Sequence, residues 1–188
     1  MKKIDKNSAL KLLAVVLVQL FIVFSLGAYY FSIHQGGEII RLEIEPVDPT
    51  DLIRGDYVVF SYRGISRIYL SEHGYSEESF RLGDNIYVSL VERSDGVSQL
   101  GEVSKEKPES GVFLTGRVKK IRQDTATVIY GIEEYFIPER TGRMVEFRGK
   151  KVEAEVAVSK TGKAVLREIY LNGEVWPGSK SEDRNWVE

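Results

Sequence analysis

The stretch that decides the architecture of this chain is Leu12–Phe31, LLAVVLVQLFIVFSLGAYYF. It contains no charged residue, and at about 1.5 Å of rise per residue a helix of this length crosses a hydrocarbon core about 30 Å thick. The sequence that follows is polar, rich in turn-forming residues and too long to be a short tail. We therefore expect a water-facing domain that a single helix attaches to a membrane through contact with lipid.

The charges on either side of this stretch predict its orientation. The N-terminal flank holds an excess of positive charge, whereas residues 32–37 carry no fixed positive charge; the flanking charges are Lys2, Lys3, Lys6, Lys11 and the single acid Asp5. Because positively charged flanks stay in the cytoplasm, we expect a single-pass protein of the cell membrane with a cytoplasmic N-terminus and an extracytoplasmic C-terminal domain.

A cleaved signal peptide is the competing interpretation of the apolar stretch. Signal peptides usually have an apolar region of about 7–15 residues followed by a site of the form small-x-small. The stretch here is longer, and the only acceptable triplet, Ser25–Gly27, is followed by bulky aromatic residues. These features favour an anchor that is retained.

The overall composition excludes several classes of partner and site. The chain has 28 acidic and 26 basic residues and no basic stripe, so we expect no nucleic-acid partner. The absence of cysteine excludes disulfides, cysteine-ligated metals and lipid attachment at cysteine. His34 and His73 are isolated and lack metal-site spacing, so no metal and no cofactor are predicted.

The rest of the chain predicts mostly β structure. In Glu38–Glu45, Ile40, Leu42 and Ile44 alternate with charged residues, which is typical of a half-buried strand. Similar segments predict further strands at Tyr57–Tyr62, Asn85–Val91, Val112–Ile121, Thr125–Tyr130, Val145–Phe147, Val152–Val158 and Ala164–Leu171. The polar segment Gly101–Ser110 is expected to be a surface loop.

Turn signals between these segments complete the prediction. Lys160–Lys163 is expected at the tip of a β-hairpin, and short helical turns are expected at Pro49–Ile53 and Ser76–Phe80. The fold class is therefore mainly β: an N-terminal transmembrane helix followed by one antiparallel β-rich domain, a sandwich or an open barrel. The expected organisation is a cytoplasmic N-terminus (1–11), the transmembrane helix (12–31), a linker (32–37), the β domain (38–176) and a polar tail (177–188).

The most informative segment of the β domain is Pro46–Tyr62, PVDPTDLIRGDYVVFSY. Its prolines restrict the backbone, and Asp48 and Asp51 can accept backbone N–H bonds in turns. Gly55 permits a positive φ directly before a strand. These features predict a tightly defined connection that enters the strand at Tyr57.

This segment resembles the GDYXXLXY family of membrane-anchored proteins, named for a Gly-Asp-Tyr-x-x-Leu-x-Tyr motif. Gly55, Asp56, Tyr57 and Tyr62 match the motif, and Phe60 stands where the name has Leu. The later segments Tyr130–Glu139 and Val156–Gly173 are also similar to the family pattern. The resemblance implies an N-terminal anchor, and family members are often found with multi-pass membrane proteins. The family is uncharacterised, so no catalytic residue is carried over.

We interpret the chain as a non-catalytic binding or assembly module for another membrane protein of the cell envelope, with a multi-pass protein as the expected partner. The segment Pro46–Tyr62 lies close enough to the membrane to dock such a partner, and the candidate binding residues are Asp48, Asp51, Arg54, Gly55, Asp56, Tyr57, Tyr62 and Glu139.

Two enzymatic interpretations compete with this one. A signal-peptidase-like serine protease needs a hydroxyl nucleophile four residues before Pro49, where this chain has Glu45, so acyl transfer has no first step. A carboxylate-dependent hydrolase or cation-binding domain acting on envelope polymers would use Asp48, Asp51, Asp56 or Glu139. The structural interpretation, in which these acids cap turns and pair with Arg54, is preferred. The alternatives differ in whether three or more of the carboxylates line one cleft.

Overall fold

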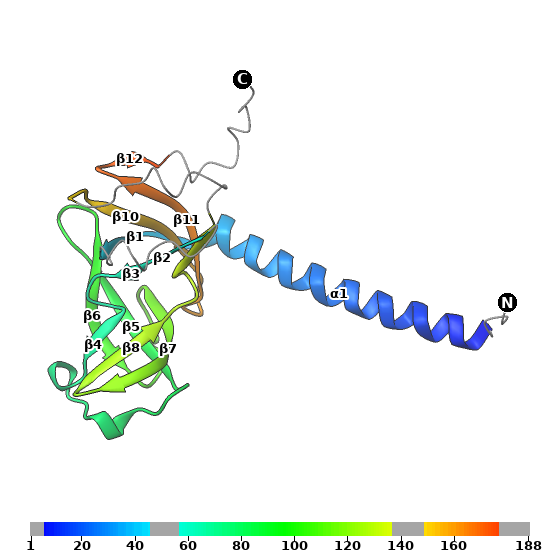
Figure 1. Cartoon of the computed structure of the whole chain (residues 1–188), viewed down its shortest axis with the longest axis horizontal. Helices are drawn as coiled ribbons and strands as arrows, with labels where there is room; N and C mark the ends of the chain where they lie inside the picture. The colour runs from blue at the N-terminus through cyan, green and yellow to red at the C-terminus, as the bar shows by residue number, and fades with distance from the viewer. Residues whose placement is uncertain (1–5, 46–56, 137–148, 177–188) are drawn as a thin grey trace.

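The computed structural model of the chain describes residues 6–45, 57–136 and 149–176. A long helix, α1 (Lys6–Gly36), projects from one side of a β domain (Figure 1). Residues Leu10–Gly36 of this helix are long and apolar enough to cross a membrane. The helix continues through residues 32–36, which the sequence analysis assigned to a linker, and strand β1 begins two residues later at Glu38.

The β domain contains one large sheet and one small sheet. The strands are β1 (Glu38–Glu45), β2 (Tyr57–Val59), β3 (Ser61–Tyr62), β4 (Arg67–Tyr69), β5 (Asn85–Glu92), β6 (Ser98–Ser104), β7 (Phe113–Arg122), β8 (Thr125–Ile129), β9 (Glu134–Phe136), β10 (Val152–Val158), β11 (Ala164–Leu171) and β12 (Glu174–Val175). The large sheet has the order β12-β11-β10-β1-β6-β5-β7-β8-β4, with β3 also paired to β1, and β2 pairs with β9. Its pairings are antiparallel except for β1 with β6.

The large sheet curves back on itself through strands β3 and β4. β3 pairs with the end of β1, and β4 follows after a turn at residues 63–66 and pairs with β8. The strands β1, β6, β5, β7, β8 and β3–β4 therefore form a ring, an open barrel. β10, β11 and β12 extend from β1 beside it (Figure 1).

The core fills this ring and continues over β10 and β11, where Ala154, Val156 and Ile169 are buried. Leu42 of β1, Ile86 of β5, Leu114 of β7 and Val128 of β8 are all buried. The even-numbered residues of β1 point inward and the odd-numbered ones outward, as the alternation of the sequence predicts. The domain, which lacks cysteine, is held together by this packing.

The prediction of a mainly β fold with one N-terminal helix is confirmed. The hairpin at Lys160–Lys163 is also confirmed, since it joins β10 to β11, and residues Glu77–Ser79 form the short helix expected near Ser76. The segments Pro49–Ile53 and Val145–Phe147 lie outside the described residues.

Two sequence-based predictions differ from the structure. The first half of the expected loop Gly101–Ser110 belongs to β6, because Val103 is buried and pairs with Val88 of β5. The expected strand Tyr57–Tyr62 is interrupted at Phe60, where the chain changes partner. Tyr57–Val59 pairs with β9, Phe60 N–H donates to the carbonyl of Glu133 at 2.6 Å, and Ser61–Tyr62 pairs with β1.

Candidate functional site

The ring of strands has an incomplete seam along β1. On one side β1 pairs with β10 from Glu38 to Glu43. On the other side β6 contributes a single bridge, Leu42 with Ser98, after which β3 pairs with Ile44 and Glu45. From Glu38 to Arg41, this second edge of β1 has no paired strand among the residues that the structure describes.

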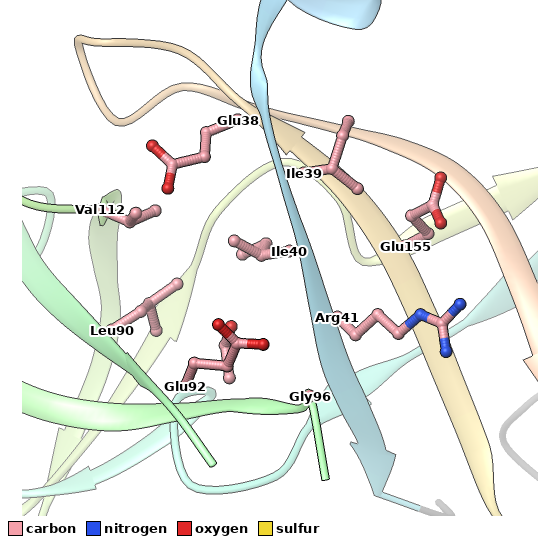
Figure 2. A pocket seen from close by; sticks show the side chains of 10 residues that line it. Glu38, Ile39, Ile40, Arg41, Leu90, Glu92, Gly96, Val112 and Glu155 are labelled. Carbon is pink, nitrogen blue, oxygen red and sulfur yellow. The ribbon is translucent and has the colours of Figure 1, made fainter. Parts of the chain in front are cut away.

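A pocket of about 370 Å³ fills the gap beside this unpaired edge. Ile40, Leu90 and Val112 supply apolar side chains, and Glu38 and Glu92 stand among them (Figure 2). We call this set of five residues the β1 seam. In Figure 2, Glu38 and Ile40 point from β1 toward the seam, whereas Ile39 and Arg41 lie on the other side of the strand near Glu155.

Contacts at both ends hold the β1 seam open at a fixed width. At one end lies the bridge between Leu42 and Ser98. At the other end the tip of the β10–β11 hairpin docks on β7: Thr115 N–H donates to the carbonyl of Gly162 at 2.8 Å, and the Thr115 hydroxyl donates to the carbonyl of Thr161 at 2.9 Å. The gap is thus a built feature of the barrel wall and not a frayed strand end.

The electrostatics of the seam differ between its two sides. Glu38 and Glu92 are exposed, and neither forms an ion pair with another described residue. Across β1, Arg41 lies over the ring of Tyr170 at 4.6 Å, and the Tyr170 hydroxyl donates to Glu155 at 3.1 Å. Partial burial and the nearby charge of Glu155 raise the pKa of Tyr170. The seam side therefore carries negative charge that no described cation within 4 Å compensates.

A network of ion pairs covers the far end of β1. Glu43 lies 3.1 Å from Arg63 and 3.5 Å from Arg93. Its cross-strand neighbour Glu153, which is 5% exposed, lies 2.6 Å from the amine of Lys151. The hydrogen bond to Glu153 raises the pKa of Lys151. The two acids face each other on adjacent strands, and these cations balance their repulsion.

The structure describes only part of the candidate binding set that the sequence suggested. Asp48, Asp51, Arg54, Gly55, Asp56 and Glu139 lie outside the described residues. Tyr57 opens β2, where its backbone pairs with Phe136. Tyr62 lies in β3 and is 1% exposed. Glu45, which precedes the segment Pro46–Tyr62, forms a 2.6 Å ion pair with Arg67.

Tyr62 connects two of the segments that carry the family resemblance. Its hydroxyl donates to the carbonyl of Ile132 at 2.5 Å, and burial, with a smaller contribution from the charge of Glu133, raises its pKa well above the ordinary value. The Glu133 carboxylate in turn accepts backbone N–H bonds from Tyr130 at 2.6 Å, Gly131 at 2.8 Å and Ile132 at 3.1 Å. Glu133 is therefore the acceptor that organises a tight turn.

The described carboxylates differ in whether a cation balances their charge. Most of those near β1 are compensated by a cation, as Glu43, Glu45, Glu153 and Glu155 show. Within residues 6–45, 57–136 and 149–176, no group of three or more His, Asp or Glu is placed to hold a metal ion. What the seam offers instead is backbone, apolar surface and unpaired negative charge, a combination suited to binding.

Sequence reasoning did not find the β1 seam. Its residues come from β1, the end of β5 and the residue before β7: about fifty positions separate β1 from the end of β5, and about twenty more lead to Val112. Alternation in Glu38–Glu45 correctly placed Ile40 on the inner face. No local signal shows that the strand beside it is missing, because strand pairing is a property of the tertiary structure.

The family model described as GDYXXLXY protein matches residues 19–169. The matched region begins within α1 and ends in β11, so it includes both the helix–domain junction and the seam. No curated protein and no solved structure gives a significant match to the chain.

Proposed function

The chain belongs to the GDYXXLXY protein family, and on this premise we propose that it is a single-pass membrane protein whose extracytoplasmic β domain binds another membrane protein of the envelope. The observation that carries the proposal is the unpaired length of β1 that directly follows the helix. The β domain acts as a binding and assembly module, and the helix anchors it in the lipid.

The junction between helix and domain supports a fixed placement of the seam near the membrane. Ile33 of α1 is 4% exposed, and α1 contacts β10 and β11. Gly37 N–H donates to the carbonyl of Ile33 at 2.8 Å, and a side chain on Gly37 would lie 3.0 Å from the backbone nitrogen of Val158. With the helix packed onto the sheet, the domain cannot swing freely, and the seam stays close to the bilayer.

The seam suits an extended segment of the partner. A strand added beside Glu38–Arg41 would run for about 13 Å, at about 3.3 Å per residue, and would satisfy backbone groups of the open edge. Ile40, Leu90 and Val112 would receive an apolar side chain. The unpaired carboxylates of Glu38 and Glu92 favour lysine or arginine beside that side chain. Partner specificity would come from this combination.

The helix provides a second surface within the bilayer. Its side chains from Leu10 to Phe31 are exposed in the isolated chain. Gln19 is the single amide in this apolar stretch, and such a group commonly hydrogen-bonds across a helix–helix interface in lipid. A multi-pass partner can therefore engage the helix and the seam together, and two linked contacts bind more tightly than either alone.

Photo-crosslinking in intact cells tests this proposal. A photoreactive amino acid at Glu38 or Glu92 of the full-length protein should capture the same multi-pass membrane protein, whereas one at Glu72, an exposed acid outside the seam, should not. The charge reversals Glu38→Lys and Glu92→Lys together should lower co-purification of that partner about tenfold or more. The matched control is Glu72→Lys with Glu78→Lys, two exposed acids in the 71–79 segment.

Two results together would contradict the proposal: a detergent pull-down that yields no stoichiometric membrane protein, and identical crosslinking patterns from the seam and control positions.

A further inference from the structure

A second pocket, of about 430 Å³, lies where α1 joins the β domain. The last helical residue, Gly36, and the following Gly37 form one wall, and the loop before β7 and the start of the β10–β11 hairpin form the others. The charged side chains that line it are Glu38, Lys107, Glu109 and Lys160. We call this the junction pocket.

The position of the junction pocket along the helix places it at the level of lipid headgroups. Gly36 follows Phe31, the last residue of the apolar stretch, by five residues, which is about 7.5 Å of helix. The headgroup layer on each side of a bilayer is about 5–7 Å thick. Ile33 is already buried against the domain, so the domain begins within this layer. This step rests on the proposed membrane anchor.

The charges of the junction pocket are balanced yet unpaired. Two lysines and two glutamates line it, and none of the four forms an ion pair within 4 Å with any described residue. The amine of Lys107 instead lies 5.8 Å from the ring centre of Phe113. Charged groups of both signs that do not neutralise one another are complementary to a ligand that also carries both signs.

We propose that the junction pocket binds the headgroup of a zwitterionic phospholipid, namely phosphoethanolamine. Lys107 and Lys160 hold the phosphate, and Glu109 accepts hydrogen bonds from the ammonium group. Val112, Phe113 and Val158 supply the apolar part of the wall. A bound lipid at this point would fill the angle between helix and domain and add to the rigidity of the junction.

Lipid competition in nanodiscs tests the inference on the full-length chain. Nanodiscs contain phosphatidylglycerol with either phosphatidylethanolamine or phosphatidylcholine. Native mass spectrometry then counts the lipids that stay bound to the protein after the protein is released from the nanodisc. Phosphatidylcholine is the most discriminating comparison lipid, because its methylated ammonium group has no N–H to donate to a glutamate. The wild-type chain should retain phosphatidylethanolamine about fivefold over phosphatidylcholine, a difference of about 1 kcal/mol.

Three variants locate the preference. Lys107→Gln with Lys160→Gln, and separately Glu109→Gln, should bring the ratio close to one. The matched control is Lys119→Gln with Lys120→Gln, which removes the same charge from exposed positions in the second half of β7 and should leave the ratio unchanged.

Each other outcome overturns the inference. An inserted wild-type chain with no preference between the two zwitterionic lipids overturns it and leaves the proposed anchor intact, as does retention of phosphatidylglycerol alone through the lysines. A preference that survives the pocket substitutions also overturns it. Failure of the chain to enter nanodiscs through α1 removes the anchor and this inference together.

Discussion

At the scale of single residues, the tyrosines of the family segments act as cross-links within the core. Tyr62 donates to the carbonyl of Ile132, 70 positions away, and Tyr130 donates to the carbonyl of Ile65, 65 positions away. Both rings are buried, so each hydroxyl satisfies a carbonyl that water cannot reach. The last tyrosine of the motif therefore has a structural role in this chain, independent of any partner.

The substitution Tyr62→Phe should destabilise the domain. It removes one hydroxyl and leaves the carbonyl of Ile132 without that donor in a buried site, which costs about 1–3 kcal/mol in the free energy of unfolding. Tyr69→Phe is the matched control, because Tyr69 is 57% exposed and should change stability by less than about 0.5 kcal/mol. Urea unfolding followed by tryptophan fluorescence measures both. Equal stability of the two variants would contradict the structural role.

The same tyrosines predict how stability depends on alkaline pH. Burial, and secondarily the charge of Glu133, raises the pKa of both Tyr62 and Tyr130 well above 10.0. The unfolded chain therefore loses these protons first, so their contribution to stability is complete below pH 10 and falls as the pH rises above it. Above pH 10, and below its raised pKa, each tyrosine lowers the free energy of unfolding by about 1.4 kcal/mol per pH unit.

Unfolding free energies measured from pH 9 to 11 should show this loss. Lysines also titrate in this range, so the wild type is compared with Tyr62→Phe. The free energy of unfolding of the variant should fall less steeply with pH, and the difference should equal the contribution of one tyrosine. Parallel curves of unfolding free energy against pH for the two proteins would show that Tyr62 has the same pKa in the folded and unfolded states, and would contradict the prediction.

At the scale of elements, two glycines allow close approach between segments. Gly37 lies between α1 and β10, and Gly162, at a φ of +77°, lies at the hairpin tip that packs against Phe113 and Thr115. The first joins the helix to the sheet, and the second fixes one end of the β1 seam. Both proposed binding surfaces therefore depend on backbone contacts that a Cβ atom would obstruct.

The pair Gly37→Ala and Gly36→Ala isolates the helix–sheet contact. A Cβ at Gly37 would lie 2.6 Å from the carbonyl oxygen of Ile33 and 3.1 Å from that of Val158, whereas a Cβ at Gly36 meets nothing within 4 Å. Gly37→Ala should cost about 1–3 kcal/mol, since the backbone has to shift, and Gly36→Ala should be close to neutral. Thermal unfolding of the full-length protein in detergent measures the difference, about 2–4 °C for each kcal/mol. Similar melting temperatures would mean that the junction is loose.

At the scale of the whole molecule, the chain is a rod attached to a barrel. The helix passes directly into β1, and β1 belongs both to the barrel and to the β10–β12 extension (Figure 1). A displacement of the helix is therefore transmitted to the strand that borders the seam. This continuity supports the proposed role of the domain as an anchored binding module.

The proposed topology predicts which side of the membrane each end occupies. The chain has no cysteine, so a single introduced cysteine reports its own position without interference. Cysteine at the exposed Ser94 should react with a membrane-impermeant maleimide in intact cells, whereas cysteine at Lys2 should react only after the cells are broken. Protection of Ser94→Cys in intact cells, with labelling after lysis, would reverse the compartment.

Local sequence patterns were sufficient for the elements with a strong period. The apolar stretch predicted the helix, and alternation in Glu38–Glu45 predicted both β1 and its inner face. The loop assigned to Gly101–Ser110 was wrong in its first half, because Val103 alone does not produce an apolar alternation. Part of the candidate binding set stays a prediction, since those residues lie outside the part of the chain that the structure describes.

By itself the sequence determined that this chain has one long apolar helix, a cysteine-free β domain and the segments typical of its family, because each of these is written in neighbouring residues. Only the tertiary structure decided that Tyr62 is a buried cross-link, that β1 lacks a partner from Glu38 to Arg41 and that the helix packs on the sheet at Gly37. These features depend on which distant segments meet, and the free energy of such contacts comes from packing between them and not from any local preference of the chain.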